Sequence, residues 1–386
     1  MAKQLPQQVD WIIIGAGGSG LWLALELYLN GLLETHSLAI WEKDAHKTND
    51  RTWCFWAKET DPFLDQIISK SWIRHEFEGQ HVDLAPYQYH HIRSEDFYQA
   101  CKNILNTQKN VFWVLDEVVE LEEQKNAVQV KGKECNMTAK KVFNSAPLIP
   151  GKNMSLPKID LWQSFVGYHV EWPEEVLDPE SMKLMDFEVE QLGATQFMYV
   201  LPFGKKSALV ELTRFGSEVL RKEEAHDILE SYCKTIGSDF QIKDIEQAKI
   251  PMSNVFNNYK SHHPFRSRVI PLGTMGGAIK PSTGYGFLNM RAHAQEIAHA
   301  LKQKSGIPKI HRPYRFRLYD QLLLNILVQQ PEQGRPIFQR LFRNQPIQRI
   351  LKFLDERTHM LEEAKIFTHL PAGIFLDQLL KEWRLK

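Results

Sequence analysis

Hydrophobic and polar positions along the chain predict a parallel sheet covered by helices at its start. An apolar run from Trp11 to Ile14 leads into a glycine-rich turn, and a helical pattern follows from about Ser19 to Leu29. A second apolar run from Ser37 to Trp41 then completes a strand–turn–helix–strand unit. Such an order is typical of α/β proteins, in which helices cover the faces of a mostly parallel sheet.

The segments that follow are expected to extend this sheet. We predict a helix over Tyr89 to Leu105, entered through Ser94 as its N-cap. The expected additional strands are Val111 to Leu121, Ala127 to Val130 and Lys141 to Ser145.

From about Gly151 the pattern changes to strands with few helices between them, which favours an antiparallel sheet. One helix is predicted here, from Arg221 to Ile236. The four expected strands are Phe165 to Trp172, Lys183 to Glu190, Thr195 to Pro202 and Ala208 to Phe215.

A strand, a glycine loop and a helix recur late, from Arg268 to Lys302, so the chain is expected to return to the first sheet. We therefore predict a Rossmann-like domain from residues 1–150 with 262–310, and a β-sheet substrate domain from 151–261. Residues 311–386 are expected to form a helical region. Its apolar pattern from Phe338 to Leu354, with interleaved arginines, favours core packing, and a membrane-docking surface is the alternative.

The glycine turn indicates a bound dinucleotide. Gly15, Gly17 and Gly20 have the spacing G-x-G-x-x-G between a strand and a helix, where backbone N–H groups accept a pyrophosphate. Glu42 lies 22 residues after Gly20 at the end of the second strand, which is the position expected for a ribose-binding acid. We assign Glu42 and its neighbour Lys43 to the cofactor site.

Composition argues against nucleic-acid and metal binding. Lys+Arg and Asp+Glu both total 47, so no global basic field attracts nucleic acid. The four cysteines have no C-x-x-C spacing, and reduced thiols are expected. The pairs His90-His91 and His262-His263 are expected to be surface histidines, because adjacent residues of a strand face opposite ways and rarely hold one ion.

The start of the chain is polar and has no signal-peptide pattern, which indicates a cytoplasmic protein. The run from Trp11 to Leu29 is hydrophobic enough to suggest a membrane span. However, its central glycines and Glu26 favour the strand, turn and helix instead.

An antiparallel sheet interposed in a dinucleotide-binding domain suggests an FAD-binding architecture. Within this architecture, five segments resemble motifs of the lycopene cyclases and occur in the same order. The motifs are T-W-S-F, F-x-G, M-D-x-x-x-x-Q with F-x-Y-x-L-P, L-x-E-x-T and H-P-T-T-G-Y. The matching segments here are Asp50 to Trp56, Phe165 to Glu171, Met185 to Pro202, Ala208 to Thr213 and Lys280 to Tyr285. The chain is thus similar to the bacterial lycopene β-cyclases.

This resemblance implies a flavoprotein isomerase that acts without net redox change. Such enzymes use reduced FAD, with NAD(P)H as an electron source, and cyclise the ψ ends of lycopene to β-ionone rings. The ψ end is protonated at C2, the cation at C1 is attacked by the C5–C6 double bond, and C6 loses a proton. Lycopene dissolves only in lipid, so peripheral association with the inner face of the membrane is expected.

Glu211 is the expected acid, because it sits in the apolar strand Ala208-Leu-Val-Glu-Leu and at the family's glutamate position. Burial would raise its pKa and keep it neutral. Many relatives carry a second acid directly after this glutamate, and here the residue is Leu212. Asp186 is the second candidate, to orient Glu211 or share its proton, and Glu188 is expected on the same strand face.

Residues near the flavin are expected from two segments. Arg51 follows the second strand and is assigned to the FAD phosphate or the flavin site. Gly273-Thr274 replaces the Gly-Asp pair of many flavin hydroxylases. The late-loop residues expected beside the flavin ring are Gly273, Gly276, Gly277, Pro281, Thr283 and Gly284.

Two other functions are compatible with these patterns. The first is an FAD-dependent monooxygenase or prenyl-chain oxidoreductase, which would consume NAD(P)H stoichiometrically. The second is a non-catalytic flavin- or carotenoid-binding protein, for which Glu211→Ala would leave the product unchanged.

Overall fold

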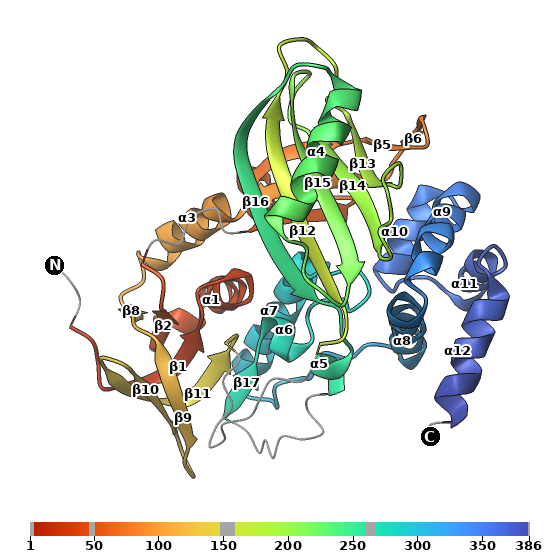
Figure 1. The fold of residues 1–386 in the computed structure, drawn as a ribbon. Helices are drawn as coiled ribbons and strands as arrows, with labels where there is room; N and C mark the ends of the chain where they lie inside the picture. The colour runs from red at the N-terminus through yellow and green to blue at the C-terminus, as the bar shows by residue number, and fades with distance from the viewer. Residues whose placement is uncertain (1–3, 46–50, 147–158, 259–267, 385–386) are drawn as a thin grey trace.

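The chain contains two large sheets (Figure 1). The computed structural model describes residues 4–45, 51–146, 159–258 and 268–384. The first sheet contains the predicted opening unit. Its central strand β1 (Gln8–Ile14) pairs in parallel with β2 (Leu38–Glu42) and with β11 (Asn136–Asn144). β17 (Val269–Pro271) pairs in parallel with β11, so the late segment returns to this sheet as predicted. The remaining strands are β8 (Val111–Leu115), β9 (Val118–Glu123) and β10 (Val128–Gly132).

Helices pack on this sheet through a common apolar core. α1 (Gly18–Leu29) is buried along most of its length and packs against α7 (Phe287–Lys302) and α3 (Ser94–Leu105). Trp22 lies at this junction, within 5.5 Å of the ring centroids of Phe63, Phe97 and Phe287. The short elements beside this core are η1 (Leu32–Glu34), α2 (Pro62–Ile67) and α6 (Gly273–Gly276).

The strand predicted from Val111 to Leu121 is two strands, because Asp116 and Glu117 form a turn. The Asp116 carboxylate accepts hydrogen bonds from the backbone N–H groups of Glu117, Lys133, Glu134 and Cys135. One carboxylate thus joins the connection between β8 and β9 to the turn between β10 and β11, and the chain crosses there from one edge of the sheet to the other.

The helix predicted from Tyr89 to Leu105 begins only at Ser94. The preceding residues form β7 (Gln88–Arg93), which is buried between two antiparallel neighbours, β3 (Thr52–Ala57) and β4 (Ile68–Trp72). Ser94 does not cap the helix, since its hydroxyl accepts a hydrogen bond from the Arg51 backbone N–H at 3.0 Å. Pairing on both edges therefore outweighs the local helical pattern of this segment.

The second sheet has the order β16-β12-β15-β14-β13-β5-β6. β12 (Trp162–Glu171) pairs antiparallel with β15 (Ser207–Gly216) on one side and with β16 (Gln241–Pro251) on the other. Although β5 and β6 precede residue 151 in the sequence, they join this sheet through β13. Its other strands are β13 (Ser181–Asp186), β14 (Thr195–Pro202), β5 (Arg74–Phe77) and β6 (Gln80–Asp83).

Helices cover both faces of the second sheet. α4 (Lys222–Ile236) crosses the face that carries Val166, Met198 and Leu212 (Figure 1). α9 (Gly334–Asn344) and α10 (Ile347–Leu354) cover the opposite face. The other helices that follow the second sheet are α5 (Val255–Asn258), α8 (Tyr314–Gln329), η3 (Pro331–Gln333), α11 (Met360–Phe367) and α12 (Ala372–Arg384).

The apolar pattern from Phe338 to Leu354 is core packing. Leu341, Ile347, Ile350 and Leu351 are buried in one cluster with residues of the second sheet. This pattern is therefore not a membrane-facing stripe. Among the helices of the described residues, none combines the length and the hydropathy that crossing a bilayer requires.

A buried ion network fastens the late loop to the C-terminal helices. Lys280 Nζ lies 3.0 Å from both Asp320 Oδ1 and Glu356 Oε1, and Arg312 pairs with the same two carboxylates. Burial alone would raise the pKa of Asp320, but Lys280 and Arg312 outweigh it and hold that pKa below its ordinary value. Removing one partner would leave an uncompensated buried charge.

We expect Lys280→Met to lower the free energy of unfolding by about 3–5 kcal/mol, because it leaves Asp320 and Glu356 with only Arg312 to balance their two charges. Urea denaturation would measure the loss. Lys205→Met is the matched control, since Lys205 pairs with Glu175 on the surface, where a salt bridge contributes about 0–1 kcal/mol. Equal losses in the two variants would show that the buried network is not stabilising.

Candidate active site

One row of residues crosses four strands of the second sheet. In the register of the sheet, Tyr199 on β14 pairs with Glu211 on β15, Glu211 pairs with Gly167 on β12, and Gly167 pairs with Glu246 on β16. Side chains at paired positions point to the same face of a sheet. The row therefore carries two glutamates and a tyrosine on one face, separated only by a glycine.

Gly167, the glycine of the F-x-G segment, leaves the space that the two glutamates occupy. A Cβ at this position would lie 3.0 Å from Glu246 Cγ and 3.5 Å from Glu211 Cβ. Any larger residue would push the two side chains apart. The absence of a side chain thus lets two carboxyl groups from different strands meet.

Glu211 is buried, and its carboxyl Oε1 accepts a hydrogen bond from Thr213 Oγ1 at 2.7 Å. Burial, and then the negative charge of Glu246, raise the pKa of Glu211 to about 8. The group is therefore protonated at neutral pH, as the sequence predicted on the ground of burial.

Glu246 is the functional residue that the sequence reasoning missed. Thr52 Oγ1 donates a hydrogen bond to Glu246 Oε2 at 2.9 Å, and His169 Nε2 lies 3.4 Å from the same oxygen. Its other oxygen, Oε1, is buried and has no donor among the described residues. β16 is a polar edge strand, and the alternation of Ile242, Ala248 and Ile250 was the only sequence signal for it.

A cavity of about 380 Å³ lies against this face. Both glutamates line it, together with side chains of α9 and α10 and with the late loop. Aromatic groups form much of its wall, among them Trp53, Trp56, Phe165, Phe197, Tyr285 and Phe287. Such a cavity fits an apolar ligand beside a neutral carboxyl group.

Three phenols and one thiol near Glu211 are neutral at ordinary pH. The hydroxyl of Tyr89 is hydrogen-bonded to those of Tyr199 and Tyr285, and burial raises the pKa of all three phenols. Burial also raises the pKa of the Cys54 thiol to about 12. The phenols and the thiol therefore add no charge to the wall.

Asp186 does not accompany Glu211. Asp186 pairs with Met198, which pairs with Leu212, and this row faces α4. Its carboxylate accepts a hydrogen bond from Tyr232 of α4 at 2.6 Å. The predicted role of Asp186 in orienting Glu211 is thus contradicted, because the two side chains occupy opposite faces of the sheet.

Glu188 and Leu212 also lie away from the cavity. β13 ends at Asp186, so Glu188 is not on a strand face as predicted, and its side chain is exposed. Leu212 is buried against α4. An acid at position 212 would therefore point away from Glu211. The second carboxyl group on the face of Glu211 is that of Glu246.

The glycine turn has the geometry expected of a dinucleotide site. A Cβ on Gly20 would collide with the carbonyl oxygen of Gly15, whose φ is +93°. Gly17 is the N-cap of α1 and brings no capping side chain, which leaves N–H groups of the first turn available to an anion. The residues present thus fit a pyrophosphate at this helix start.

Glu42 lies beside the same turn. Its Oε2 accepts a hydrogen bond from the Ala16 backbone N–H at 2.9 Å. A cavity of about 320 Å³, whose wall includes Tyr98 and Trp113, adjoins Glu42 and suits a nucleoside. The side chain of Lys43 is exposed and does not line this cavity, although its backbone N–H donates to Glu42 Oε1.

The late loop meets the start of α1 and then runs along the large cavity. A Cβ on Gly273 would lie 2.9 Å from Ser19 Oγ, so the two glycine segments are neighbours. Thr283 and Gly284 line the large cavity, and Gly276 packs against the Pro271 carbonyl.

Arg51 lines the same cavity from the side of β3. Gly277 lines a smaller pocket on the other side of the loop, and the adjacent Pro281 is buried. The structure thus gathers most of the predicted cofactor residues around one loop.

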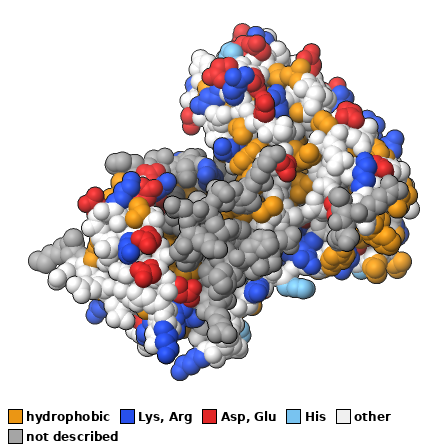
Figure 2. Space-filling model, turned by 60° about the horizontal axis from the view of Figure 1, so that its bottom comes forward, with side chains coloured by type: hydrophobic (Ala, Val, Ile, Leu, Met, Phe, Trp, Pro, Cys, Tyr) orange, Lys and Arg blue, Asp and Glu red, His pale blue; other side chains and the backbone are white. Residues whose placement is uncertain are grey.

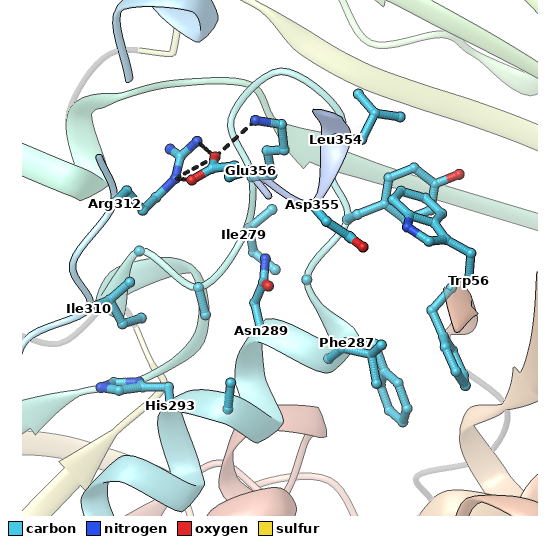
Figure 3. Close-up of a pocket in the computed structure, with 18 of the residues that line it drawn as sticks. Trp56, Ile279, Phe287, Asn289, His293, Ile310, Arg312, Leu354, Asp355 and Glu356 are labelled. Carbon is cyan, nitrogen blue, oxygen red and sulfur yellow. Dashed lines mark hydrogen bonds and ion pairs between the residues drawn. The ribbon is translucent and has the colours of Figure 1, made fainter. Parts of the chain in front are cut away.

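The smaller pocket, of about 230 Å³, shares Trp56 and Phe287 with the large cavity. In Figure 3, Arg312 and Glu356 lie on one side of it, and Trp56 and Phe287 lie on the other. Asp355 lies between them, and burial raises the pKa of its carboxyl to about 6. Trp56 and Phe287 thus lie between the smaller pocket and the large cavity.

His90 and His91 are buried rather than on the surface. Each contacts a serine of β4, Ser71 and Ser69, and burial lowers the pKa of both imidazoles to about 4. Both edges of β7 are covered, which explains the burial. His262 and His263 lie outside the described residues.

A family model described as lycopene cyclase protein matches residues 10–379 of the chain. No curated protein matches the chain at a comparable level. An HpxO variant of Klebsiella pneumoniae complexed with FAD is similar in structure, with a TM-score of 0.59 at 13% identity over 95% of this chain and 100% of that chain. p-Nitrophenol 4-monooxygenase PnpA from Pseudomonas putida DLL-E4 has a TM-score of 0.53 at 14% identity, over 97% of this chain and 98% of that chain. At this identity the likeness is one of fold.

The raised pKa of Glu211 predicts a pH dependence of stability. The folded state binds this proton more tightly than the unfolded chain does. The resulting contribution to the free energy of unfolding is fully present below pH 4.5, the ordinary pKa of the group, and is lost as the pH rises through about 8. We expect Glu211→Gln to flatten the decline of the unfolding free energy over that range, measured by urea denaturation at several pH values. Glu188→Gln, at an exposed site, should leave the decline unchanged. Identical pH dependence in wild type and Glu211→Gln would contradict the assignment.

Proposed function

The chain belongs to the lycopene cyclase protein family, and from this premise we propose that it is an FAD-dependent lycopene β-cyclase. The observation that carries the proposal is the buried Glu211 carboxyl, which faces an aromatic cavity with its pKa raised to about 8. Protonation of an unactivated alkene requires such a neutral acid in a dry site. A solvated carboxylate would be ionised at neutral pH.

In the proposed reaction Glu211 donates its proton to C2 of a ψ end of lycopene. The tertiary cation formed at C1 is attacked by the C5–C6 double bond, and loss of the proton at C6 leaves a β-ionone ring. Atoms and electrons balance within the hydrocarbon, so the product has the mass of the substrate. The enzyme would thus be an intramolecular lyase, in the isomerase class.

The cavity wall supports this chemistry in two ways. The rings of Trp56 and Phe197 line the cavity, and aromatic faces attract a cation with about 0.5–2 kcal/mol each. The phenols and the Cys54 thiol are held neutral by burial, so no thiolate or phenolate is present to trap the cation. An apolar wall also keeps out water, which would hydrate the cation.

FAD is the cofactor that we propose for the glycine turn and the late loop. Gly15, Gly17 and Gly20 would hold its pyrophosphate, and Glu42 would bind its adenosine ribose. When bound in its reduced form, FAD supplies negative charge beside the cavity, with NAD(P)H as the proposed electron source. The fold likeness to an FAD complex supports this assignment.

Expression in a lycopene-accumulating host with pigment analysis tests the proposal. We expect wild type to give cyclised carotenoids of unchanged mass, and Glu211→Gln to lower cyclisation by about 10²–10⁴-fold because general acid catalysis is lost. Asp186→Asn is the matched control, since Asp186 faces α4 and should retain cyclisation.

Flavin absorbance of the purified variants would check that the cofactor site remains intact. Full cyclisation by Glu211→Gln would overturn the acid assignment. A product heavier by one oxygen, with stoichiometric NAD(P)H consumption, would instead indicate a monooxygenase.

We further propose that α12 docks on a membrane, because lycopene resides in lipid. Leu376, Leu380 and Trp383 follow the i, i+4, i+7 spacing of one helix face and are 57%, 57% and 75% exposed. The face of α12 toward the protein instead buries the polar Gln378, which donates to Gln329. Figure 2 shows hydrophobic side chains gathered on the right-hand side of the molecule, the side of the C-terminal helices. Contact with lipid would bury this stripe.

Flotation with liposomes that contain anionic phospholipid tests this surface. We expect Leu380→Asp with Trp383→Ala to reduce the bound fraction at least about tenfold, since burial of one such side chain contributes ~1.5–3 kcal/mol. Val119→Asp, at an exposed site on β9, should bind like wild type. Unchanged flotation of the double variant would contradict docking through α12.

A further inference from the structure

We propose that Glu246 is a positioning residue that shares a single proton with Glu211 and keeps that proton available to the substrate. This inference rests on the proposed cyclase function. Glu246 stands 35 residues after Glu211 in the sequence, and only the pairing of both strands with β12 brings them together. The pair is therefore a product of the fold.

The hydrogen bonds of the two carboxyl groups leave a place for one proton. Thr213 donates to Glu211 Oε1, and Thr52 donates to Glu246 Oε2. The oxygens that remain are Glu211 Oε2 and Glu246 Oε1, and the latter is buried without a donor among the described residues. Glu211 and Glu246 are within side-chain hydrogen-bond reach, so a proton on Glu211 would supply the donor that Glu246 Oε1 lacks.

Two carboxyl groups this close and largely buried repel each other when both are ionised, so in the absence of a nearby cation the pair holds one proton and one negative charge. Other titratable groups face the pair. From β3, β7, β14 and the late loop these are Cys54, Tyr89, His91, Tyr199 and Tyr285.

Burial keeps the thiol and the phenols neutral and lowers the pKa of His91 to about 4. His169 on β12 lies 3.4 Å from Glu246 Oε2. Arg51 and Lys249 also line the cavity, and Lys249 Nζ lies over the Trp162 ring at 5.0 Å. The nearby negative charge that acts on Glu211 is therefore that of Glu246.

The shared proton closes the balance of the reaction. The alkene electron pair takes the proton from Glu211 to form the new C2–H bond, which leaves two carboxylates facing the cation at C1. When C6 loses its proton, the electrons of that C–H bond form the new double bond, and the pair regains one proton. No external acid or base is consumed.

The pH dependence of turnover separates this role from a merely structural one. In the holoenzyme, with lycopene supplied in liposomes, we expect the alkaline limit of kcat to fall by about one pH unit or more in Glu246→Gln, because loss of the like charge lowers the pKa of Glu211. At pH values above the new limit, kcat of Glu246→Gln should therefore be about tenfold lower than kcat of wild type at the same pH. Glu246→Asp, which keeps the charge, should restore the wild-type limit.

Two matched variants complete the set. Asp244→Asn removes an exposed charge from the same strand, and His169→Gln removes the imidazole beside Glu246. Both should keep the wild-type alkaline limit. A lower kcat with an unmoved pH profile in Glu246→Gln would overturn proton sharing, as would a shift of equal size in His169→Gln.

A second measurement keeps the test independent of activity. Isotope-edited infrared titration of the protein without lycopene would follow the protonated carboxyl band of Glu211, and that titration should move to lower pH in Glu246→Gln. An unmoved band would overturn the pair even if the enzyme cyclises lycopene. Failure of wild type to cyclise lycopene would instead refute the proposed function, whatever the band does.

Discussion

The candidate site depends on two carboxyl groups that lie side by side in one row on one face of a sheet. β12 holds Glu211 and Glu246 in the same row, and Gly167 between them has no side chain to keep them apart. Two negative charges this close repel each other, and we propose that one proton therefore stays bound to the pair. Burial of Glu211, and then the negative charge of Glu246, raise the pKa of Glu211.

The surrounding elements enclose this space. α4 packs on the far face of the sheet, while α9 and α10 close the near face around the aromatic cavity. The late loop that completes the wall is fastened to α8 and the segment after α10 by the buried ion network of Lys280. In this way a charged network away from the cavity stabilises the apolar wall beside it.

The fold of the chain is similar to that of HpxO, which was solved with FAD, and to that of the monooxygenase PnpA. HpxO and PnpA have the same arrangement at 13% and 14% identity, so the fold does not specify the reaction. What supports cyclisation here is local: a neutral acid, aromatic faces and few groups able to trap a cation. In the function that we propose, the first sheet and its glycine turn hold the cofactor, and the second sheet supplies the proton.

The sequence by itself determined the elements that local periodicity and backbone geometry encode. The glycine turn, Glu42, four of the seven strands of the second sheet and the burial of Glu211 followed from spacing and polarity within single segments. Only the tertiary structure decided which residues lie together. Asp186 contacts α4, and His90 and His91 are buried. Glu246 lies in the same row of the sheet as Glu211. The physical reason is that the pairing and register of strands far apart in sequence depend on contacts along their whole length, and a shift of one residue moves a side chain to the opposite face.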